Sequence, residues 1–325
     1  MFKRKTKQIV SNFVSVASLE ERVIGGFNQT LLIRGENCSN PIMLFLHGGP
    51  GTAQIGFAPK FQKVLEKDFI VVNWDQRGAG LSYSKGLKSE DLTIACLVND
   101  TVEVIEYLLN RFKQKKLFLV GHSWGSLLGT LVTQKVPEYI HSYIGIGQVV
   151  SMQDGEKISY EYTLEKAKNL NNRRALKELG KYKFDPSDMN YLDTQRKWLE
   201  KFGGSFIGVS TWDLIYSNML FATEYTFKDW SKYMKAGKQS LLALWPQMIE
   251  FNAINTIPKL DVPVYIMAGK HDYQTPFQLA EKYFHILECP YKELIWFENS
   301  GHLPNYEETD KFNKECLKIK IKHVG

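Results

Sequence analysis

The sequence predicts an α/β fold with a mostly parallel, doubly wound sheet and an inserted helical cap. Short continuous apolar runs, which are typical of strands buried on both faces, alternate with stretches of helical periodicity. This alternation stops between roughly residues 150 and 250 and then resumes. The chain has 325 residues, 44% of them hydrophobic and 23% charged, so it is a globular protein able to bury a large core.

The first part of the chain carries most of the predicted sheet. Segments 21–28 and 30–36 read as an N-terminal strand pair. The buried strands that follow are expected at 41–48, 69–75, 116–120 and 143–147, with helices between them at 59–68, 90–112 and 127–136. Strands alternating with helices imply parallel βαβ units with helices on both faces of the sheet.

The second part of the chain contains an insertion and then completes the sheet. The insertion is helix-like, charged and rich in aromatic residues, with a glycine-rich interruption at 203–208. After it we expect strands at 262–269 and 293–298, and helices at 277–287 and 307–321. The predicted organisation is therefore a core from 1–149, a helical cap from 150–255 and a second core part from 256–325. Such a cap would enclose the crevice at which open α/β sheets bind ligands.

The net charge of +6 does not indicate a nucleic-acid or membrane partner. Part of this charge lies at the two ends of the chain, where it is not interleaved with aromatic residues and matches no binding motif. No secretory or membrane-spanning apolar run is found in the sequence. The predicted partner is a small molecule or a short peptide.

The cysteine pattern favours a cytoplasmic protein without a metal site or cofactor. The four cysteines are far apart in the sequence and show neither C-x-x-C nor Cys/His ligand spacing. A disulfide framework is not indicated for so large a core, and reduced thiols fit the cytosol. Those cysteines are Cys38, Cys96, Cys289 and Cys316.

The pentapeptide Gly121-His122-Ser123-Trp124-Gly125 follows the predicted strand 116–120 and precedes a helical pattern. A G-x-S-x-G motif between a strand and a helix is typical of a nucleophile elbow, in which a sharp turn exposes the serine oxygen. Glycine is favoured where the backbone turns sharply or is closely approached. The alternative is a tight turn in which Ser123 or Ser126 caps the helix.

A serine nucleophile needs a base and a group that orients the base. Asp272 and His302 each follow a predicted strand, in the chain order Ser…Asp…His that this kind of sheet uses. His302 would accept the Ser123 proton, and Asp272 would hold the imidazole tautomer. His122 and His271 adjoin Ser123 and Asp272 in sequence, so their side chains are expected to diverge from these residues. The other histidines lie on a loop, a helix and the tail, at His141, His285 and His323.

The segment HGGPG at 47–51 supplies candidate oxyanion donors. In so glycine-rich a loop, the N–H of Gly48 or Gly49 could meet a ligand oxygen together with the N–H of Trp124. The alternative is a plain Gly-Pro turn. Phosphate-binding templates are not met at this position.

Taken together, five motifs give the chain a clear resemblance. The chain resembles the α/β-hydrolase fold and, within it, the prolyl aminopeptidase (proline iminopeptidase) group, in a match that runs in order from about residue 20 to 315. The motifs that carry this resemblance are HGGPG, WDQRGAGLS (74–82), GHSWGS, GKHDYQTP (269–276) and SGHLP. The resemblance implies a triad of Ser123, Asp272 and His302, with the oxyanion donors in the HGGPG loop and after the serine. For Asp75 and Arg77 of DQRG we expect a buried or half-buried ion pair that ties loops together, rather than a catalytic role.

Substrate recognition is where the chain departs from that group. The resemblance implies that acidic residues of the cap bind the free amine of the substrate. Glu224 is the candidate for this role in the present chain. The alternative is that Glu224 is an exposed glutamate at the end of a helix. The other cap glutamates weighed for this role are Glu161, Glu200 and Glu250. His122 occupies a position that is often glycine in aminopeptidases and often histidine in esterases and lipases.

Aromatic cap residues could line an apolar pocket, although packing between cap and sheet is the default expectation for them. These residues are Trp198, Phe202, Phe206, Trp212, Tyr216, Phe221 and Trp230.

The predicted function is a serine hydrolase that acts through an acyl-enzyme. It would be an aminopeptidase that releases N-terminal proline or another small residue from short peptides. One alternative is a carboxylesterase or small amidase with the same triad. Another is a non-catalytic binding protein on a hydrolase scaffold.

Overall fold

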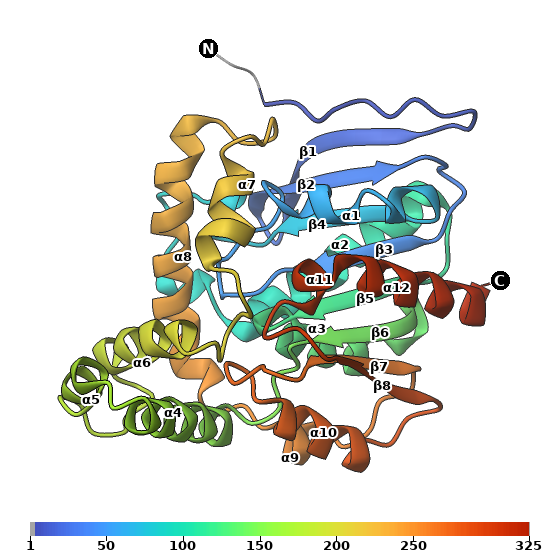
Figure 1. Cartoon of the computed structure of the whole chain (residues 1–325). Helices are drawn as coiled ribbons and strands as arrows, with labels where there is room; N and C mark the ends of the chain where they lie inside the picture. The colour runs from blue at the N-terminus through green and yellow to red at the C-terminus, as the bar shows by residue number, and fades with distance from the viewer. Residues whose placement is uncertain (1–3, 325) are drawn as a thin grey trace.

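The computed structural model describes residues 4–324 and contains one eight-stranded sheet (Figure 1). The strand order is β1-β2-β4-β3-β5-β6-β7-β8. Strand β2 pairs antiparallel with both β1 and β4, and all pairs from β4 to β8 are parallel. The strands are β1 (Val16–Ile24), β2 (Phe27–Gly35), β3 (Ile42–Leu46), β4 (Ile70–Asp75), β5 (Leu117–His122), β6 (Ile140–Ile146), β7 (Val264–Gly269) and β8 (Lys292–Phe297). The predicted fold class is confirmed.

Helices cover both faces of the sheet, because successive side chains of each buried strand point to opposite faces. Leu44 and Leu119 belong to one core cluster, which they share with Leu97 of α2 and Leu127 of α3. Their strand neighbours Phe45 and Phe118 belong to a second cluster, which includes α12 residues. The core helices are α1 (Ala58–Gln62), α2 (Ile94–Phe112), α3 (Trp124–Lys135), α10 (Phe277–Ile286), α11 (Pro304–Glu307) and α12 (Thr309–Val324). This two-sided burial explains why the strands read as continuous apolar runs.

The segment between β6 and β7 is helical, and we call its helices the cap. They are α4 (Met152–Asn169), α5 (Arg173–Leu179), α6 (Met189–Lys201), the short π-helical turn η5 (Trp212–Tyr216), α7 (Ser217–Met219), α8 (Phe227–Met248) and α9 (Ala253–Thr256). In Figure 1, α6 and α8 lie beside one end of the sheet. Residues that follow β3, β5 and β6 line a cavity together with α6 and α8, so this end carries the carboxyl ends of the parallel strands.

None of the helices within residues 4–324 is long and apolar enough to cross a membrane.

Candidate active site

Ser123 lies in a strained turn between β5 and α3. Its backbone has φ 54° and ψ −121°, an unfavourable conformation for a residue with a side chain. A Cβ at Gly121 would meet the carbonyl oxygen of Gly125 at 2.3 Å, and one at Gly125 would meet that of Leu46 at 2.1 Å. The two glycines therefore allow the backbone segments of this turn to pack together. Ser123 makes no side-chain capping bond to α3, so the structure does not support the capping alternative for this residue.

Asp272 and His302 are brought together from two loops. His302 Nδ1 lies 2.9 Å from Asp272 Oδ2, and both side chains are buried. The other carboxylate oxygen accepts the N–H groups of Gln274 and Thr275, each at 2.9 Å. The Thr275 hydroxyl donates to Asp272 Oδ2 at 2.8 Å and lies 3.1 Å from His302 Nδ1. Because a carboxylate only accepts, Nδ1 carries the proton and Nε2 of His302 is free to accept one.

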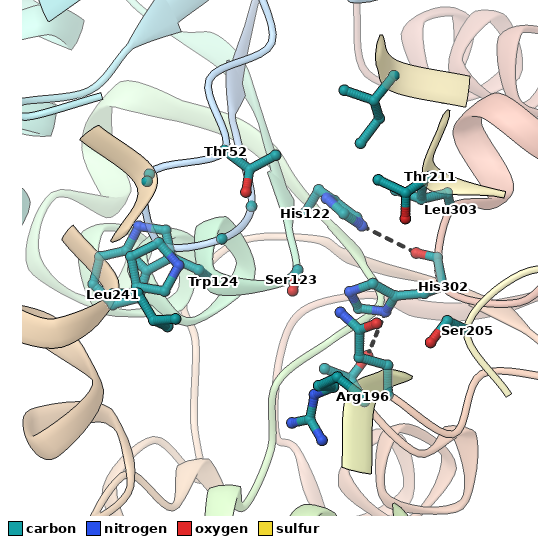
Figure 2. Close-up of a pocket in the computed structure, with 18 of the residues that line it drawn as sticks. Thr52, His122, Ser123, Trp124, Arg196, Ser205, Thr211, Leu241, His302 and Leu303 are labelled. Atoms are coloured by element: carbon teal, nitrogen blue, oxygen red, sulfur yellow. Dashed lines mark hydrogen bonds between the residues drawn. The ribbon is translucent and has the colours of Figure 1, made fainter. Parts of the chain in front are cut away.

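His302 and Ser123 line the same cavity. Within residues 4–324, the buried Nε2 of His302 has no hydrogen-bond partner, and it makes no hydrogen bond to Ser123 in this structure. Both residues lie against the carboxyl end of β6. The Ser123 N–H donates to the carbonyl of Ile146 at 2.9 Å, and a Cβ at Gly147 would lie 2.9 Å from the His302 ring. Figure 2 shows the two side chains in one view of the cavity, with His302 beside Ser123.

His122 holds the segment that carries His302. Its Nε2 lies 3.0 Å from the carbonyl oxygen of His302, and the two rings are 4.9 Å apart (Figure 2). Because a carbonyl only accepts, Nε2 of His122 donates this bond. Burial lowers the pKa of His122 to about 3, so the ring is neutral. Sequence reasoning did not find this role, because the two residues are 180 positions apart.

The HGGPG loop is held in one orientation by His47 and Thr52. The Gly48 carbonyl lies 2.8 Å from His47 Nδ1 and accepts the Thr52 N–H at 3.2 Å. Burial lowers the pKa of His47 to about 4, so this ring is neutral and donates through Nδ1. In a trans peptide the Gly49 N–H points opposite to the Gly48 carbonyl. Gly48 and Gly49 line the cavity with Trp124, which begins α3 and therefore has no intrahelical partner for its N–H.

Gln76 connects the two sources of candidate oxyanion donors. Its N–H donates to His47 Nε2 at 3.1 Å, and its side-chain amide donates to the His47 carbonyl at 3.2 Å. Its side-chain oxygen accepts the indole N–H of Trp124 at 2.9 Å. All three side chains are buried. Sequence reasoning missed this role, although a glutamine between Asp75 and Arg77 in a motif next to a buried strand was the available signal.

The expected ion pair between Asp75 and Arg77 is wrong. Arg77 instead pairs with Asp100 of α2 at 2.5 Å. Asp75 accepts hydrogen bonds from the Tyr225 hydroxyl and from the Leu81 N–H, the latter at 2.9 Å. Asp75 is the last residue of β4 and the chain turns after it, so the two side chains point to different neighbours. Asp75 and Arg77 still connect separate segments of the chain, as the sequence predicted, but each does so through a different partner.

The cavity has a volume of about 600 Å³ and two chemically different walls. One face of α6 contributes the charged residues Asp193, Arg196 and Glu200, whose spacing places them on one side of a helix, together with the apolar Met189 and Leu192. Glu156 of α4 adds to this charged wall. Helix α8 lines the cavity with Met234, Leu241, Leu242, Trp245, Met248 and one cation, Lys238.

Glu224, the sequence-based candidate for amine binding, is buried but is not among the residues that line the cavity. Glu161 and Glu250 do not line it either, whereas Glu200 does, and Glu200 accepts hydrogen bonds from Thr211. Among the aromatic cap residues, Phe206 and Tyr216 line the cavity. Trp198 and Phe202 pack in a small cluster with α5, and the side chains of Trp212 and Phe221 are exposed.

Comparison with known proteins agrees with this architecture. The α/β-hydrolase fold family matches residues 41–309. The protein named "Probable aminopeptidase YbaC" from Bacillus subtilis (strain 168) is 38% identical over 302 residues, which cover 92% of this chain and 94% of the relative. A proline iminopeptidase from Heyndrickxia coagulans is 23% identical and covers 85% of this chain and 89% of its own length.

Among solved structures, a proline iminopeptidase from Mycobacterium smegmatis aligns with a TM-score of 0.70 at 15% identity, covering 94% of this chain and 98% of that one. At this identity the likeness shows the fold. The relatives together support the expected resemblance to prolyl aminopeptidases. The chain belongs to the α/β-hydrolase fold family and is a prolyl-aminopeptidase-like hydrolase.

Proposed function

We propose that this protein is a serine hydrolase whose nucleophile is Ser123. The observation that carries the proposal is the buried, unpartnered Nε2 of His302, which shares a cavity with Ser123 while Asp272 holds the opposite ring nitrogen. A neutral imidazole with a free, buried acceptor nitrogen is suited to removing a proton from a hydroxyl. The strained conformation of Ser123 supports the same role.

In the first half-reaction, His302 Nε2 takes the Ser123 proton as Oγ attacks the substrate carbonyl. The negative charge on the carbonyl oxygen is stabilised by the N–H groups of Trp124 and of Gly49 or Gly48. His302, now a cation stabilised by Asp272, gives its proton to the leaving group, and the acyl group stays on Oγ. In the second half-reaction, water gives a proton to His302 and attacks the acyl carbonyl, which restores Ser123.

We further propose that the acyl group comes from an N-terminal proline or another small residue of a short peptide. The relatives named as aminopeptidases support this specificity. The charged wall supports it as well, because Asp193 and Glu200 line the cavity and an acidic side chain can pair with a substrate ammonium group. In this proposal Asp193 and Glu200 take the role that sequence reasoning gave to Glu224. The four cysteines are free thiols, which supports the cytoplasmic location that we propose.

The test is a panel of aminoacyl p-nitroanilides measured beside short-chain p-nitrophenyl esters. We expect proline p-nitroanilide to be hydrolysed, and its N-acetylated form to be a poor substrate because it has no ammonium group. Labelling by a fluorophosphonate should occur in the native protein and should be absent in Ser123→Ala. A native protein that is not labelled would contradict a serine nucleophile.

A carboxylesterase with the same triad is the second candidate. The apolar wall formed by α8 favours it, because such a surface also suits an uncharged acyl chain. Hydrolysis of the esters without any p-nitroanilide hydrolysis would support the esterase and remove the aminopeptidase proposal.

A further inference from the structure

We propose that Arg196 binds the free carboxylate of the substrate on the leaving-group side of the cavity, so that dipeptides are the preferred substrate class. This inference rests on the proposed function and specifies it. It follows from how Arg196 is held, from the donors it leaves unused and from its position relative to His302.

Arg196 is fixed by a buried network that joins α4 and α6. Its guanidinium donates to Glu156 Oε1 and to Gln195 Oε1. Gln195 is itself held by Ser159 Oγ at 2.8 Å and by Thr163 Oγ1 at 3.1 Å. Glu156 and Gln195 are buried, so the guanidinium is positioned before any ligand arrives.

The guanidinium keeps donors available to a ligand. Of its five N–H groups, one on Nη1 and one on Nη2 are used in the bonds to Gln195 and Glu156. The Arg196 side chain remains 24% exposed and lines the cavity. The N–H groups that remain, on Nε and on both Nη atoms, suit a carboxylate, which arginine binds through two parallel hydrogen bonds. The side chain therefore has the chemistry of an anion subsite in a wall that also carries Asp193 and Glu200.

The position of Arg196 indicates which part of the substrate it meets. Its partner Glu156 lines a small adjoining cavity with Gln274 and Thr275, and Thr275 contacts His302. In Figure 2, Arg196 lies below Ser123 and His302, whereas Trp124 and Leu241 lie to the left of Ser123. His302 delivers its proton to the leaving nitrogen, so the leaving group lies beside His302. The pair of Arg196 and Glu156 reaches this region because Glu156 lies near Gln274 and Thr275.

A dipeptide satisfies this geometry best. In its leaving residue, the carboxylate carbon is two bonds from the nitrogen that His302 protonates. Each additional residue would move the carboxylate by up to about 3.5 Å along an extended chain. A C-terminal amide lacks the negative charge altogether. Dipeptides with a free carboxylate should therefore be cleaved better than their amides or than longer peptides.

The wild-type enzyme provides the first test. The kcat/KM for prolyl-alanine is compared with that for prolyl-alanine amide and for prolyl-trialanine. We expect prolyl-alanine to be favoured roughly tenfold to a hundredfold, as a charge-assisted contact implies. Equal values for prolyl-alanine and its amide would overturn the proposal.

Variants then assign the preference to Arg196. Arg196→Gln should reduce the ratio of prolyl-alanine to its amide toward one. Because this change leaves Glu156 buried without its cation, the double variant Glu156→Gln, Arg196→Gln is measured as well. Lys197→Gln is the matched control, since it removes a cation from the next position of α6, where Lys197 pairs with Glu178, which does not line the cavity. The Lys197→Gln control should keep the wild-type ratio of kcat/KM for prolyl-alanine to that for its amide. Equal losses of kcat/KM on both substrates in the Arg196 variants would indicate that Arg196 has a purely structural role.

Two further measurements separate the possible outcomes. If glutamyl-alanine amide, which carries its carboxylate on the acyl side, depends on Arg196 instead, the leaving-group assignment is wrong. If esters but no peptides are hydrolysed, the aminopeptidase part of the proposed function fails, and the subsite is tested by inhibition of p-nitrophenyl acetate hydrolysis. Prolyl-alanine should then inhibit more strongly than its amide, and equal inhibition would overturn the Arg196 proposal independently.

Discussion

Replacing Asp75 with asparagine should remove a pH-dependent loss of stability. Asp75 is fully buried, and its Oδ1 has no hydrogen-bond partner among residues 4–324. Burial raises its pKa from 3.8 to about 7, although the hydrogen bonds from Tyr225 and Leu81 act in the opposite direction. The folded protein therefore retains a proton over a pH range in which the unfolded chain has already released it.

The sign and size of the effect follow from this difference. Because the folded state binds the extra proton, the free energy of unfolding falls as the pH rises from about 4 to about 7. A shift of about three pKa units corresponds to a total loss of about 4 kcal/mol, which is absent below the unfolded pKa and complete above the folded one. About 2.5 kcal/mol of this loss falls between pH 5 and pH 8.

Urea unfolding of the wild type and of Asp75→Asn at pH 5 and pH 8 measures the effect. Asparagine keeps an oxygen that can accept from Tyr225 and Leu81 but carries no charge. Other groups titrate equally in both proteins, so the difference between them isolates Asp75. Relative to the wild type, the variant should gain about 2.5 kcal/mol between the two pH values, or about 5 °C in Tm.

Tyr225→Phe is the matched control, because it removes a donor that stabilises the carboxylate. The pKa of Asp75 should rise further, and the loss of stability should extend to higher pH. Wild-type and Asp75→Asn stabilities that run parallel from pH 5 to pH 8 would refute the reasoning.

Three further predictions concern the proposed chemistry. Ser123→Ala should lower kcat by about 10⁴ or more while the thermal unfolding profile is retained, and a variant with substantial turnover would exclude Ser123 as the nucleophile. Asp272→Asn should lower kcat by a similar order, because an amide that donates to Nδ1 leaves the wrong nitrogen of His302 protonated; an unchanged pH–rate profile with near-normal kcat would contradict this role. Gln76→Leu should lower kcat roughly tenfold to a hundredfold with little change in KM, since the contacts between the HGGPG loop and Trp124 are lost while the substrate-binding wall is intact. A change confined to KM would place Gln76 outside the positioning of the oxyanion donors.

Local patterns were sufficient to predict the strands, most helices and the sharp turn at Ser123. Strands such as β3 and β5 are buried on both faces, so they appear as unbroken apolar runs that the sequence displays directly. Gly121 and Gly125 could be interpreted because glycine is required wherever a Cβ would collide with backbone. Asp272 and His302 could be proposed as partners because both follow strands of one parallel sheet, whose carboxyl ends share an edge.

The remaining assignments depended on contacts between distant segments. The sequence alone determined which residues turn the chain and form its strands, since backbone preference and burial leave a local periodicity. Only the tertiary structure decided that Arg77 pairs with Asp100, that His122 holds His302, and that Arg196 lines the cavity whereas Glu224 does not. The physical reason is that the packing of whole helices and strands decides which partner a side chain meets. The helical spacing of Asp193, Arg196 and Glu200 predicts that they share one face of α6, but it does not predict which part of the protein that face contacts.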